Sequence, residues 1–513
     1  MAKKKNVFGY LLRKCNETNK SQKKQSNEEK DGKTPVNVFP NLSYFNFEKR
    51  ARKCAQKYLK KMPKDMGTAL ALKADGTTSL AFSIEKEMCE QFDMYAICDM
   101  DRVFVHEPGN GHFTEMDQQK FSLFASQAYH DTAVEPLLSE GVKKGVFSRL
   151  LSAPSIQISQ DLLDAQERFL NVANGVVDLV TGKLKKHDAN KYGFLGVLPF
   201  KYMPKYGKGK RMPRRFKQML RKTFPDKDDR KRFLQCLAYL ISNDRSKKVA
   251  FFWVGQPHTG KSTFQRLLAR IVGKENISNV PLAKFSDRFS IASLFGKKIN
   301  MAGETGKTTL KSLEVFKAVV GNDWIDAEFK GQDHFSFLAK AKNLFCGNSL
   351  PLLGRETAEK AVYDRFEFLE FKNPVSKKKQ VPFYEDELLE KEGDEILTVL
   401  IRELREFYKN GRQFTESRSS VALKKKFKKE CKSQDGVEAC LKDCLTRNAK
   451  SDVPIHDACN VYRAYAQANG FEVLSDSEFI RELLSKGPFN RKRMHPSRNL
   501  QYRAIVGLSL KKE

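Results

Sequence analysis

The feature that most constrains the fold is a nine-residue loop between two regular patterns. The apolar run 249–254 (Val-Ala-Phe-Phe-Trp-Val) has the composition of a buried parallel strand. It leads into Gly255-Gln-Pro-His-Thr-Gly-Lys-Ser-Thr263, which fits the pattern G-x-x-x-x-G-K-[ST] at every fixed position. Apolar residues then recur at helical spacing from Phe264 to Val272. This order of strand, loop and helix predicts a phosphate-binding loop in a parallel α/β sheet.

The chemistry of the loop follows from its residue types. Two glycines let backbone N–H groups point at phosphate oxygens, and the helix N-terminus adds positive potential. We expect Lys261 to reach the β- and γ-phosphates and Ser262 to ligate Mg²⁺. ATP and Mg²⁺ are therefore the predicted cofactors. The predicted binding residues are Gly255, Gln256, Pro257, His258, Thr259, Gly260, Lys261, Ser262 and Thr263.

Three more polar residues accompany apolar runs further along the chain. Glu304 follows the run 299–302, where a strand-end carboxylate would hold Mg²⁺ or polarise an attacking water. Asn348 ends another run and is expected to bond the γ-phosphate or that water. Arg365 stands before a third run and would stabilise phosphoryl charge, including that on a neighbouring subunit's ATP. Taken singly, such residues are usually exposed or salt-bridged. Their order favours a catalytic set of Lys261, Glu304, Asn348 and Arg365.

Composition excludes several classes of protein. The chain has 40% hydrophobic and 11% aromatic residues, enough for packed cores, so wholesale disorder is excluded. No apolar stretch approaches the ~18 residues of a membrane span, and the run 7–12 is too short for a signal-peptide core. Ten scattered Cys without a C-x-x-C pair argue against a zinc site and favour free thiols in a reducing cytoplasm, most simply that of a bacterial host. A net charge of +31 predicts a polyanionic partner, because the basic residues are clustered.

The pattern along the chain predicts six regions. They are a flexible basic arm at 1–40, an N-terminal α+β domain at 41–200, a basic helical linker or collar at 201–248, the α/β core at 249–375, a helical connector at 376–450 and a DNA-binding domain at 451–513. Within the second region we expect strands over 94–106, a helix over 161–170 and a hairpin-like segment over 169–184.

The order of these motifs resembles superfamily 3 helicases. A phosphate loop, a strand-end Glu, a hairpin, a strand ending in Asn-x-x-Pro and an Asp-Arg-Phe element are most similar to the branch of poxvirus primase-helicases and of satellite-phage or plasmid replication proteins. Residues 174–184 resemble the segment before the helicase core. The C-terminus, with Tyr462, Tyr465 and the run 475–479, resembles the winged-helix tail. The resemblance covers about 160–510, and its specific motifs are those of the ATPase core.

This resemblance implies a fold and an activity. The fold class is α/β, an AAA+-like P-loop ATPase core with an α+β N-terminal region and a C-terminal winged-helix domain. The family implies a hexameric ring that hydrolyses ATP at subunit interfaces and translocates on single-stranded DNA. Lys261, Ser262, Glu304, Asn348 and Arg365 match its functional positions. One departure is Gly303, which stands where many members have a second acidic residue, so Mg²⁺ would rest on Ser262 and water with Glu304 as base.

Two basic segments are candidates for DNA contact. In the resembling family, the hairpin between the Glu and Asn motifs projects into the central channel, which makes Lys330 and His334 candidates for the DNA backbone with Lys317 in support. The residues of the predicted wing are Arg491, Lys492, Arg493 and Arg498. The alternatives are a solvated hairpin and a solubilising charge run.

The sequence favours an ATP-dependent replicative DNA helicase of a phage, satellite element or plasmid. Its predicted partners are single-stranded and forked DNA, an origin duplex as a further possibility, and other copies of the chain; no membrane is expected. A DNA-binding initiator whose ATPase only switches assembly is the alternative, and it would not need Lys330. A helicase-primase would need carboxylate pairs for two metals. Asp99 and Asp101 have that local look, but no third carboxylate or catalytic His accompanies them, which favours turn or strand-edge roles. A packaging ATPase is a further alternative, but the Asn348 motif and the C-terminal tail fit it less well than they fit a helicase.

Overall fold

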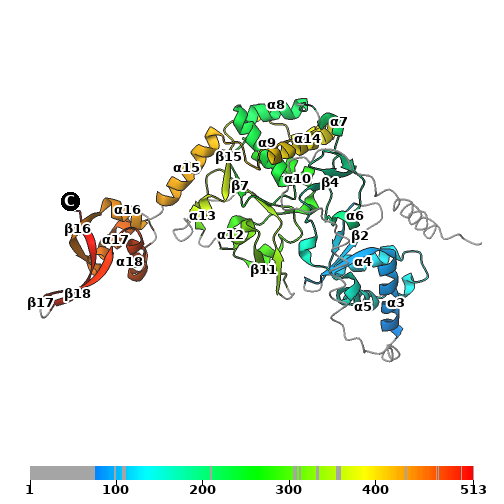
Figure 1. Cartoon of the computed structure of the whole chain (residues 1–513), viewed down its shortest axis with the longest axis horizontal. Helices are drawn as coiled ribbons and strands as arrows, with labels where there is room; N and C mark the ends of the chain where they lie inside the picture. The colour runs from blue at the N-terminus through cyan, green and yellow to red at the C-terminus, as the bar shows by residue number, and fades with distance from the viewer. Residues whose placement is uncertain are drawn as a thin grey trace, which may run out of the picture. The chain divides into compact units, whose positions relative to one another are not determined.

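The computed structural model describes most of the chain after residue 75 (Figure 1). The described residues are 76–97, 100–106, 111–207, 209, 211–303, 309–310, 314–330, 334–353, 360–433, 436–469, 471, 473–497 and 500–511. The predicted basic arm at 1–40 lies outside them. None of the helices in these ranges is long and apolar enough to cross a membrane.

The first described part combines three helices with a small antiparallel sheet. The helices are α3 (Gly76–Gln91), α4 (Gln118–Ala128) and α5 (Glu140–Ser152), and the strands β1 (Asp93–Ile97), β2 (Arg102–His106) and β3 (Thr114–Met116) pair in the order β1-β2-β3. This confirms the strands predicted over 94–106. Asp101 lies in the β1–β2 connection with a φ of 50°, a left-handed conformation that Asp tolerates in turns. Asp101 therefore lies in a turn, as expected. Asp99 lies outside the described residues.

A second antiparallel sheet follows, and one helix prediction fails in front of it. The strands β4 (Phe169–Val172), β5 (Gly175–Asp178) and β6 (Leu184–Lys185) form the hairpin-like segment predicted over 169–184. The helix predicted over 161–170 is wrong. Only a single 3₁₀ turn, Gln160–Leu162, forms there. Asp164 then takes a φ of 46° and bonds the backbone of Leu195, so tertiary hydrogen bonds replace the helical ones.

Helices surround the start of the core. After the short α6 (Ala189–Tyr192) and α7 (Pro204–Gly207) come α8 (Arg214–Thr223) and α9 (Lys227–Ile241). Asp226 begins α9 by accepting hydrogen bonds from two backbone N–H groups of its first turn. The long α14 (Tyr384–Lys409) contacts α7, α8, α9 and α10. This group of helices lies together in Figure 1.

The core is a five-stranded parallel sheet. Its strands are β7 (Ala250–Val254), β8 (Ile277–Ser278), β9 (Ile299–Ala302), β13 (Lys342–Gly347) and β15 (Phe366–Glu370), in the order β15-β7-β13-β9-β8. Every pair is parallel. β7, β9 and β13 are buried along their whole length, as expected when helices cover both faces of a parallel sheet. The coarse α/β prediction is confirmed.

Shorter elements fill the connections of this sheet. The helices are α10 (Lys261–Val272), α11 (Arg288–Ala292), α12 (Glu314–Gly321) and α13 (Lys360–Tyr363). β11 (Trp324–Glu328) and β12 (His334–Leu338) form an antiparallel hairpin, and β10 (Thr309–Leu310) pairs in parallel with β14 (Leu352–Leu353). The helix α15 (Arg418–Ser433) packs on β15 through the fully buried Phe427.

The C-terminal part has its own core. It contains α16 (Gly436–Asp443), β16 (Leu445–Pro454), α17 (Ile455–Asn469), α18 (Asp476–Ser485), β17 (Asn490–Ser497) and β18 (Leu500–Leu510), with the sheet order β16-β18-β17. Val437 and Cys440 of α16 join the same buried cluster as Tyr462 and Phe479. The packed part therefore begins near residue 436, ahead of the boundary predicted at 451. A capping box of Ser475 and Glu478 begins α18.

Candidate functional site

The loop 255–260 lies at the carboxyl edge of the parallel sheet. It follows the last residue of β7, and the neighbouring strands β13 and β15 end at the same edge, because all three run in parallel. The backbone N–H of Gly255 bonds the carbonyl of Gly347 at 3.2 Å, which ties the loop to the end of β13. A Cβ at Gly255 would lie 2.3 Å from the backbone oxygen of Phe371, so only glycine fits. Ligands of open α/β sheets bind at this edge.

The backbone of the loop turns back on itself before α10 begins. His258 has a φ of 63° and Gly260 a φ of 91°, both in the left-handed region. Thr259 is buried and its hydroxyl donates to the carbonyl of Gln256 at 2.8 Å, which closes the loop internally. Gly260 precedes the twelve-residue α10 and, as N-cap, supplies no side-chain cap. The first N–H groups of α10 therefore remain available for an anion.

The structure brings Lys261 and Asn348 together. The Lys261 Nζ lies 3.3 Å from the Oδ1 of Asn348 and 2.9 Å from the carbonyl oxygen of Gln256. Asn348 is exposed directly after β13, and Ser262 is exposed in the first turn of α10. An ammonium group, an amide and an exposed hydroxyl thus surround a helix N-terminus. This arrangement suits a phosphorylated ligand with a metal ion.

One predicted site residue cannot be placed relative to this group. Glu304 lies outside the described residues, although β9 ends at Ala302 on the same edge of the sheet. No described atom lies within 4 Å of a Cβ built at Gly303. Packing by the described residues therefore does not require glycine at the position where the resembling family often has an acid.

Arg365 lies at the amino ends of the parallel strands, opposite the carboxyl edge that carries the loop. It precedes β15, and its carbonyl accepts a hydrogen bond from the N–H of Ala250, the first residue of β7. Lys261 follows the other end of β7, so a strand of five residues, roughly 16 Å long, separates the two edges. Arg365 cannot serve the loop of its own chain in this arrangement. Action on a neighbouring subunit stays a prediction.

The β11–β12 hairpin exists as predicted, with Lys330 exposed in its turn. His334 is exposed opposite Glu328, and its Nε2 lies 3.4 Å from the Oε2 of that carboxylate. The same carboxylate oxygen is 3.1 Å from the Nε of Arg288. Lys317 is half-buried on α12 rather than on the hairpin. Of the three predicted contacts, Lys330 is the exposed one for which no ion pair to another described residue is found.

The predicted wing residues lie on a strand. Arg491, Lys492 and Arg493 are exposed on β17, and Arg493 is directly opposite Arg503 of β18. Like charges facing each other across a strand pair destabilise the pair unless an anion compensates them. Arg498 lies outside the described residues.

One contact beneath the hairpin was not predicted. The guanidinium of Arg102, from β2, lies 4.7 Å above the ring of Phe329, and that ring stacks on Phe335 of β12. Glu115 of β3 holds the same arginine, with 3.0 Å between the Nε and the Oε1. The N-terminal sheet thereby supports the hairpin. The residues involved are more than two hundred positions apart, and no local pattern signals the contact.

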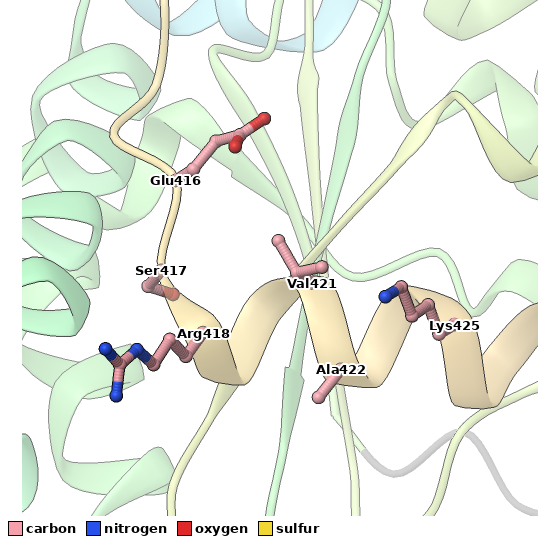
Figure 2. Close-up of a pocket in the computed structure, with 6 residues that line it drawn as sticks. All are labelled: Glu416, Ser417, Arg418, Val421, Ala422 and Lys425. Atoms are coloured by element: carbon pink, nitrogen blue, oxygen red, sulfur yellow. The ribbon is translucent and has the colours of Figure 1, made fainter.

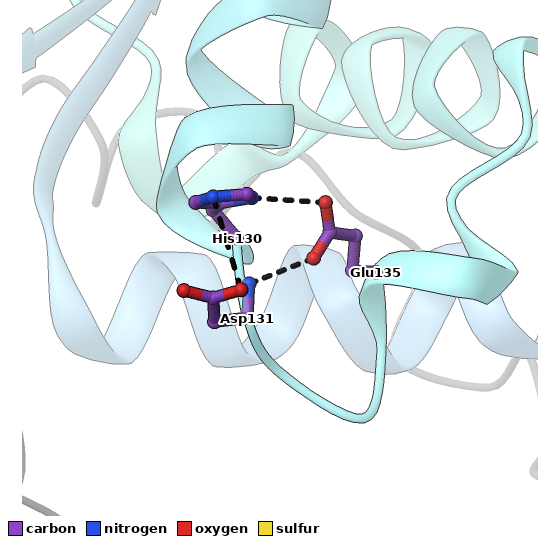
Figure 3. A group of neighbouring side chains, drawn as sticks. All are labelled: His130, Asp131 and Glu135. Atoms are coloured by element: carbon purple, nitrogen blue, oxygen red, sulfur yellow. Dashed lines mark hydrogen bonds and ion pairs between the residues drawn. The ribbon is translucent and has the colours of Figure 1, made fainter.

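Two other features lie outside this site. A shallow pocket of about 430 Å³ lies at the start of α15, lined by Glu416, Ser417, Arg418, Val421, Ala422 and Lys425 (Figure 2). Figure 3 shows an exposed group of His130, Asp131 and Glu135. The Glu135 carboxylate bonds the His130 Nδ1 at 3.0 Å and the Asp131 N–H at 2.7 Å, and it raises the pKa of His130. These groups satisfy one another.

The chain is similar to known proteins in two segments. Residues 32–225 match the family described as "D5 N terminal like", and residues 253–365 match a family of unknown function, DUF5906. A curated relative, "Putative helicase 121R" of Invertebrate iridescent virus 3, is 26% identical over 242 residues. That stretch is 45% of this chain and 25% of the relative, so the chain matches about a quarter of the relative's length.

Among solved structures, the C-terminal region of NrS-1 is similar. Its apo structure covering 305–718 has a TM-score of 0.45 and 13% identity, over 85% of this chain and 100% of that one. The A form apo structure has a TM-score of 0.43 and 13% identity, over 83% of this chain and 99% of that one. The sequence matches alone, to a family described as "D5 N terminal like" and to a viral protein named as a helicase, agree with the coarser prediction of a helicase-like replication protein. Membership of superfamily 3 stays a prediction.

Proposed function

We propose that this chain is an ATP-dependent DNA helicase of the superfamily 3 type, active as a ring of identical subunits, most simply a hexamer. The observation that carries the proposal is the meeting of Lys261 with Asn348 at the N-terminus of α10, on the carboxyl edge of a parallel sheet. The β11–β12 hairpin belongs to the same core and presents Lys330. The similarity to a viral protein named as a helicase agrees with this function.

In the proposed reaction, the chain acts by positioning and charge. The N–H groups of the loop and Lys261 would bind the β- and γ-phosphates of ATP. The carbonyl of Gln256 accepts a hydrogen bond from the Lys261 ammonium and so keeps it at the loop. Asn348 would orient the γ-phosphate or the attacking water. Ser262 is the described residue suited to hold Mg²⁺, which would neutralise phosphate charge.

The neighbouring copy has a defined role in the proposal. Because Arg365 lies at the edge away from the loop of its own chain, it would reach the ATP held by an adjacent subunit. Glu304 would serve as the base, and translocation would follow from movement of Lys330 along the phosphates of single-stranded DNA. The β17–β18 hairpin, with its opposed Arg493 and Arg503, would contact duplex DNA as the wing of a winged helix.

The test compares ATP hydrolysis, with and without single-stranded DNA, and strand displacement on a forked duplex. Lys261→Ala should abolish both activities. Lys330→Ala should keep basal hydrolysis and lose displacement, and Lys120→Ala, an exposed lysine on α4, is the control that should keep both. A wild-type protein that hydrolyses ATP but never separates strands, even on an origin-bearing duplex, would favour the initiator function instead.

A further inference from the structure

The helix α8 has one apolar face and one cationic face. Phe216, Leu220 and Thr223 are buried against the neighbouring helices. The opposite face exposes four cations, and the helix contains no acidic residue. We call these residues the α8 basic face: Arg214, Lys217, Arg221 and Lys222.

Acidic side chains near α8 are engaged elsewhere on the helix. Glu387 pairs with Arg215, with 2.6 Å between the Oε1 and the guanidinium. Glu392 accepts hydrogen bonds from the backbone N–H groups of Arg215 and Phe216, both at 2.9 Å, and so caps the start of α8. Among the described residues, no ion pair engages the α8 basic face. The charge on this face is therefore available to an external partner.

The spacing of this face suits a phosphate backbone. Arg214, Lys217 and Arg221 follow one another at i, i+3 and i+7, on one side of the helix. With a rise of about 1.5 Å per residue, the three span about 10 Å, or roughly three steps of a nucleic-acid strand at 3.4 Å each. Arginine and lysine on a regular helix face are the usual means of sequence-independent phosphate contact.

The end of α8 is connected to the phosphate loop. The Asn373 side-chain amide donates to the carbonyls of Lys222 and Thr223, at 3.1 and 3.2 Å. Two residues later, the N–H of Val375 donates to the carbonyl of His258 within the loop, at 2.8 Å. The segment 371–375 thus touches both the last turn of α8 and the loop. A displacement of α8 would reach the loop through Asn373.

We propose that the α8 basic face binds the phosphate backbone of a nucleic-acid strand, and that Asn373 transmits this binding to the phosphate loop. The binding half of this proposal, that the α8 basic face binds nucleic acid, rests on the charge distribution of α8 alone. The coupling half, that Asn373 transmits the binding to the phosphate loop, rests on the proposed function, because it concerns ATP hydrolysis. Asn373 is a positioning residue here; it touches neither nucleotide nor nucleic acid.

The binding half is tested with fluorescein-labelled single-stranded and duplex oligonucleotides of mixed sequence, between 50 and 200 mM salt. The variant is Arg214→Gln/Lys217→Gln/Arg221→Gln. The control is Lys120→Gln/Lys144→Gln/Lys274→Gln, which removes the same charge from three scattered exposed sites on other elements. Loss of three phosphate contacts should lower the slope of log affinity against log salt by about 2 on single strands.

That slope corresponds to a measurable ratio. Across the fourfold salt range, the wild type should lose about 16-fold more affinity than the variant, while the control should follow the wild type. Equal slopes for the variant and the control would overturn the binding half and leave the face as solvated charge. Loss of binding to anionic phospholipid vesicles without any loss on oligonucleotides would overturn it in favour of a membrane surface.

The coupling half is tested by the stimulation of ATP hydrolysis by single-stranded DNA. Asn373→Ala should keep basal hydrolysis, thermal stability and oligonucleotide affinity but lose the stimulation, whereas Asn373→Gln, which keeps an amide donor, should restore part of it. Stimulation unchanged in Asn373→Ala would overturn the coupling. If the wild type does not hydrolyse ATP, the proposed function and the coupling fail together, and the oligonucleotide slopes still decide the binding half.

Discussion

The stack of Arg102 on Phe329 allows a quantitative prediction, because the chain contains a second stack of an arginine on a phenylalanine at the same distance. Arg102 lies 4.7 Å over Phe329 and its side chain is 7% exposed, with Glu115 beside it. Arg149 also lies 4.7 Å over a ring, that of Phe82, but its side chain is 36% exposed and Phe82 is 51% exposed. The two pairs share one distance between cation and ring centroid and differ in burial.

The strength of the two stacks should follow this difference. A cation over an aromatic face contributes about 0.5–1 kcal/mol when exposed and about 2 kcal/mol when desolvated. We therefore expect a double-mutant cycle of Arg102→Met and Phe329→Leu to give a coupling of about 2 kcal/mol. The cycle of Arg149→Met and Phe82→Leu should give about 0.5 kcal/mol. The ion pair to Glu115 is lost both in Arg102→Met and in the double variant, so its contribution cancels in the cycle.

Native-state hydrogen exchange measures both couplings as opening free energies. The reporting amides are those of β12 for the first cycle and those of α3 and α5 for the second. If the coupling free energy of Arg102 and Phe329 equals that of Arg149 and Phe82 within about 0.3 kcal/mol, the reasoning from burial is refuted. A large coupling would establish that the N-terminal sheet holds the hairpin that carries Lys330.

Three further predictions concern single residues. Gly255→Ala would press a Cβ against the rigid backbone of Phe371; overpacking costs about 1–3 kcal/mol, so nucleotide affinity should fall roughly ten- to a hundredfold in a titration, and wild-type affinity would contradict this. Burial lowers the pKa of Lys340 to about 7 from its usual 10.5, so the unfolded chain holds more protons between these values and stability rises with pH there; Lys340→Met should reduce the rise between pH 7 and 9 in urea denaturation, and an unchanged rise would count against it. Phe427 is fully buried, with its ring 4.9 Å from that of Phe368; Phe427→Ala should lower the free energy of unfolding by about 3–5 kcal/mol, and a loss under about 1 kcal/mol would disagree.

What could be predicted from the sequence was local. The strand, loop and helix around Gly260 are contiguous, so their composition and spacing were sufficient. The hairpin was predictable for the same reason, because its two strands are separated by a short turn. The helix expected over 161–170 failed because the bonds that shape this segment come from Gly193 and Leu195, which no local window includes.

The position of Arg365 could have been predicted from the direction of the strands, which the spacing of the motifs does not give. Asn348 follows its strand, whereas Arg365 precedes its own. In a parallel sheet these positions fall on opposite edges, so strand direction already separates Arg365 from the loop. The contacts of Asn373 with α8, and of Arg102 with Phe329, join residues 150 or more positions apart and follow only from the tertiary fold.

The order of the central sheet has a consequence for how the protein is made. Phe252 of β7 pairs with Phe345 and Phe368, which come about 90 and about 115 residues later in the chain. At synthesis rates of about 5–20 residues per second, β7 emerges roughly 6 to 23 s before its last partner. For most of that interval an apolar strand lacks both of its partners, in the state most open to aggregation and to capture by chaperones. The loop at its end gains its neighbour Phe371 only at the close of this period, so a chain released short of β15 would contain the whole motif without the backbone that packs against Gly255.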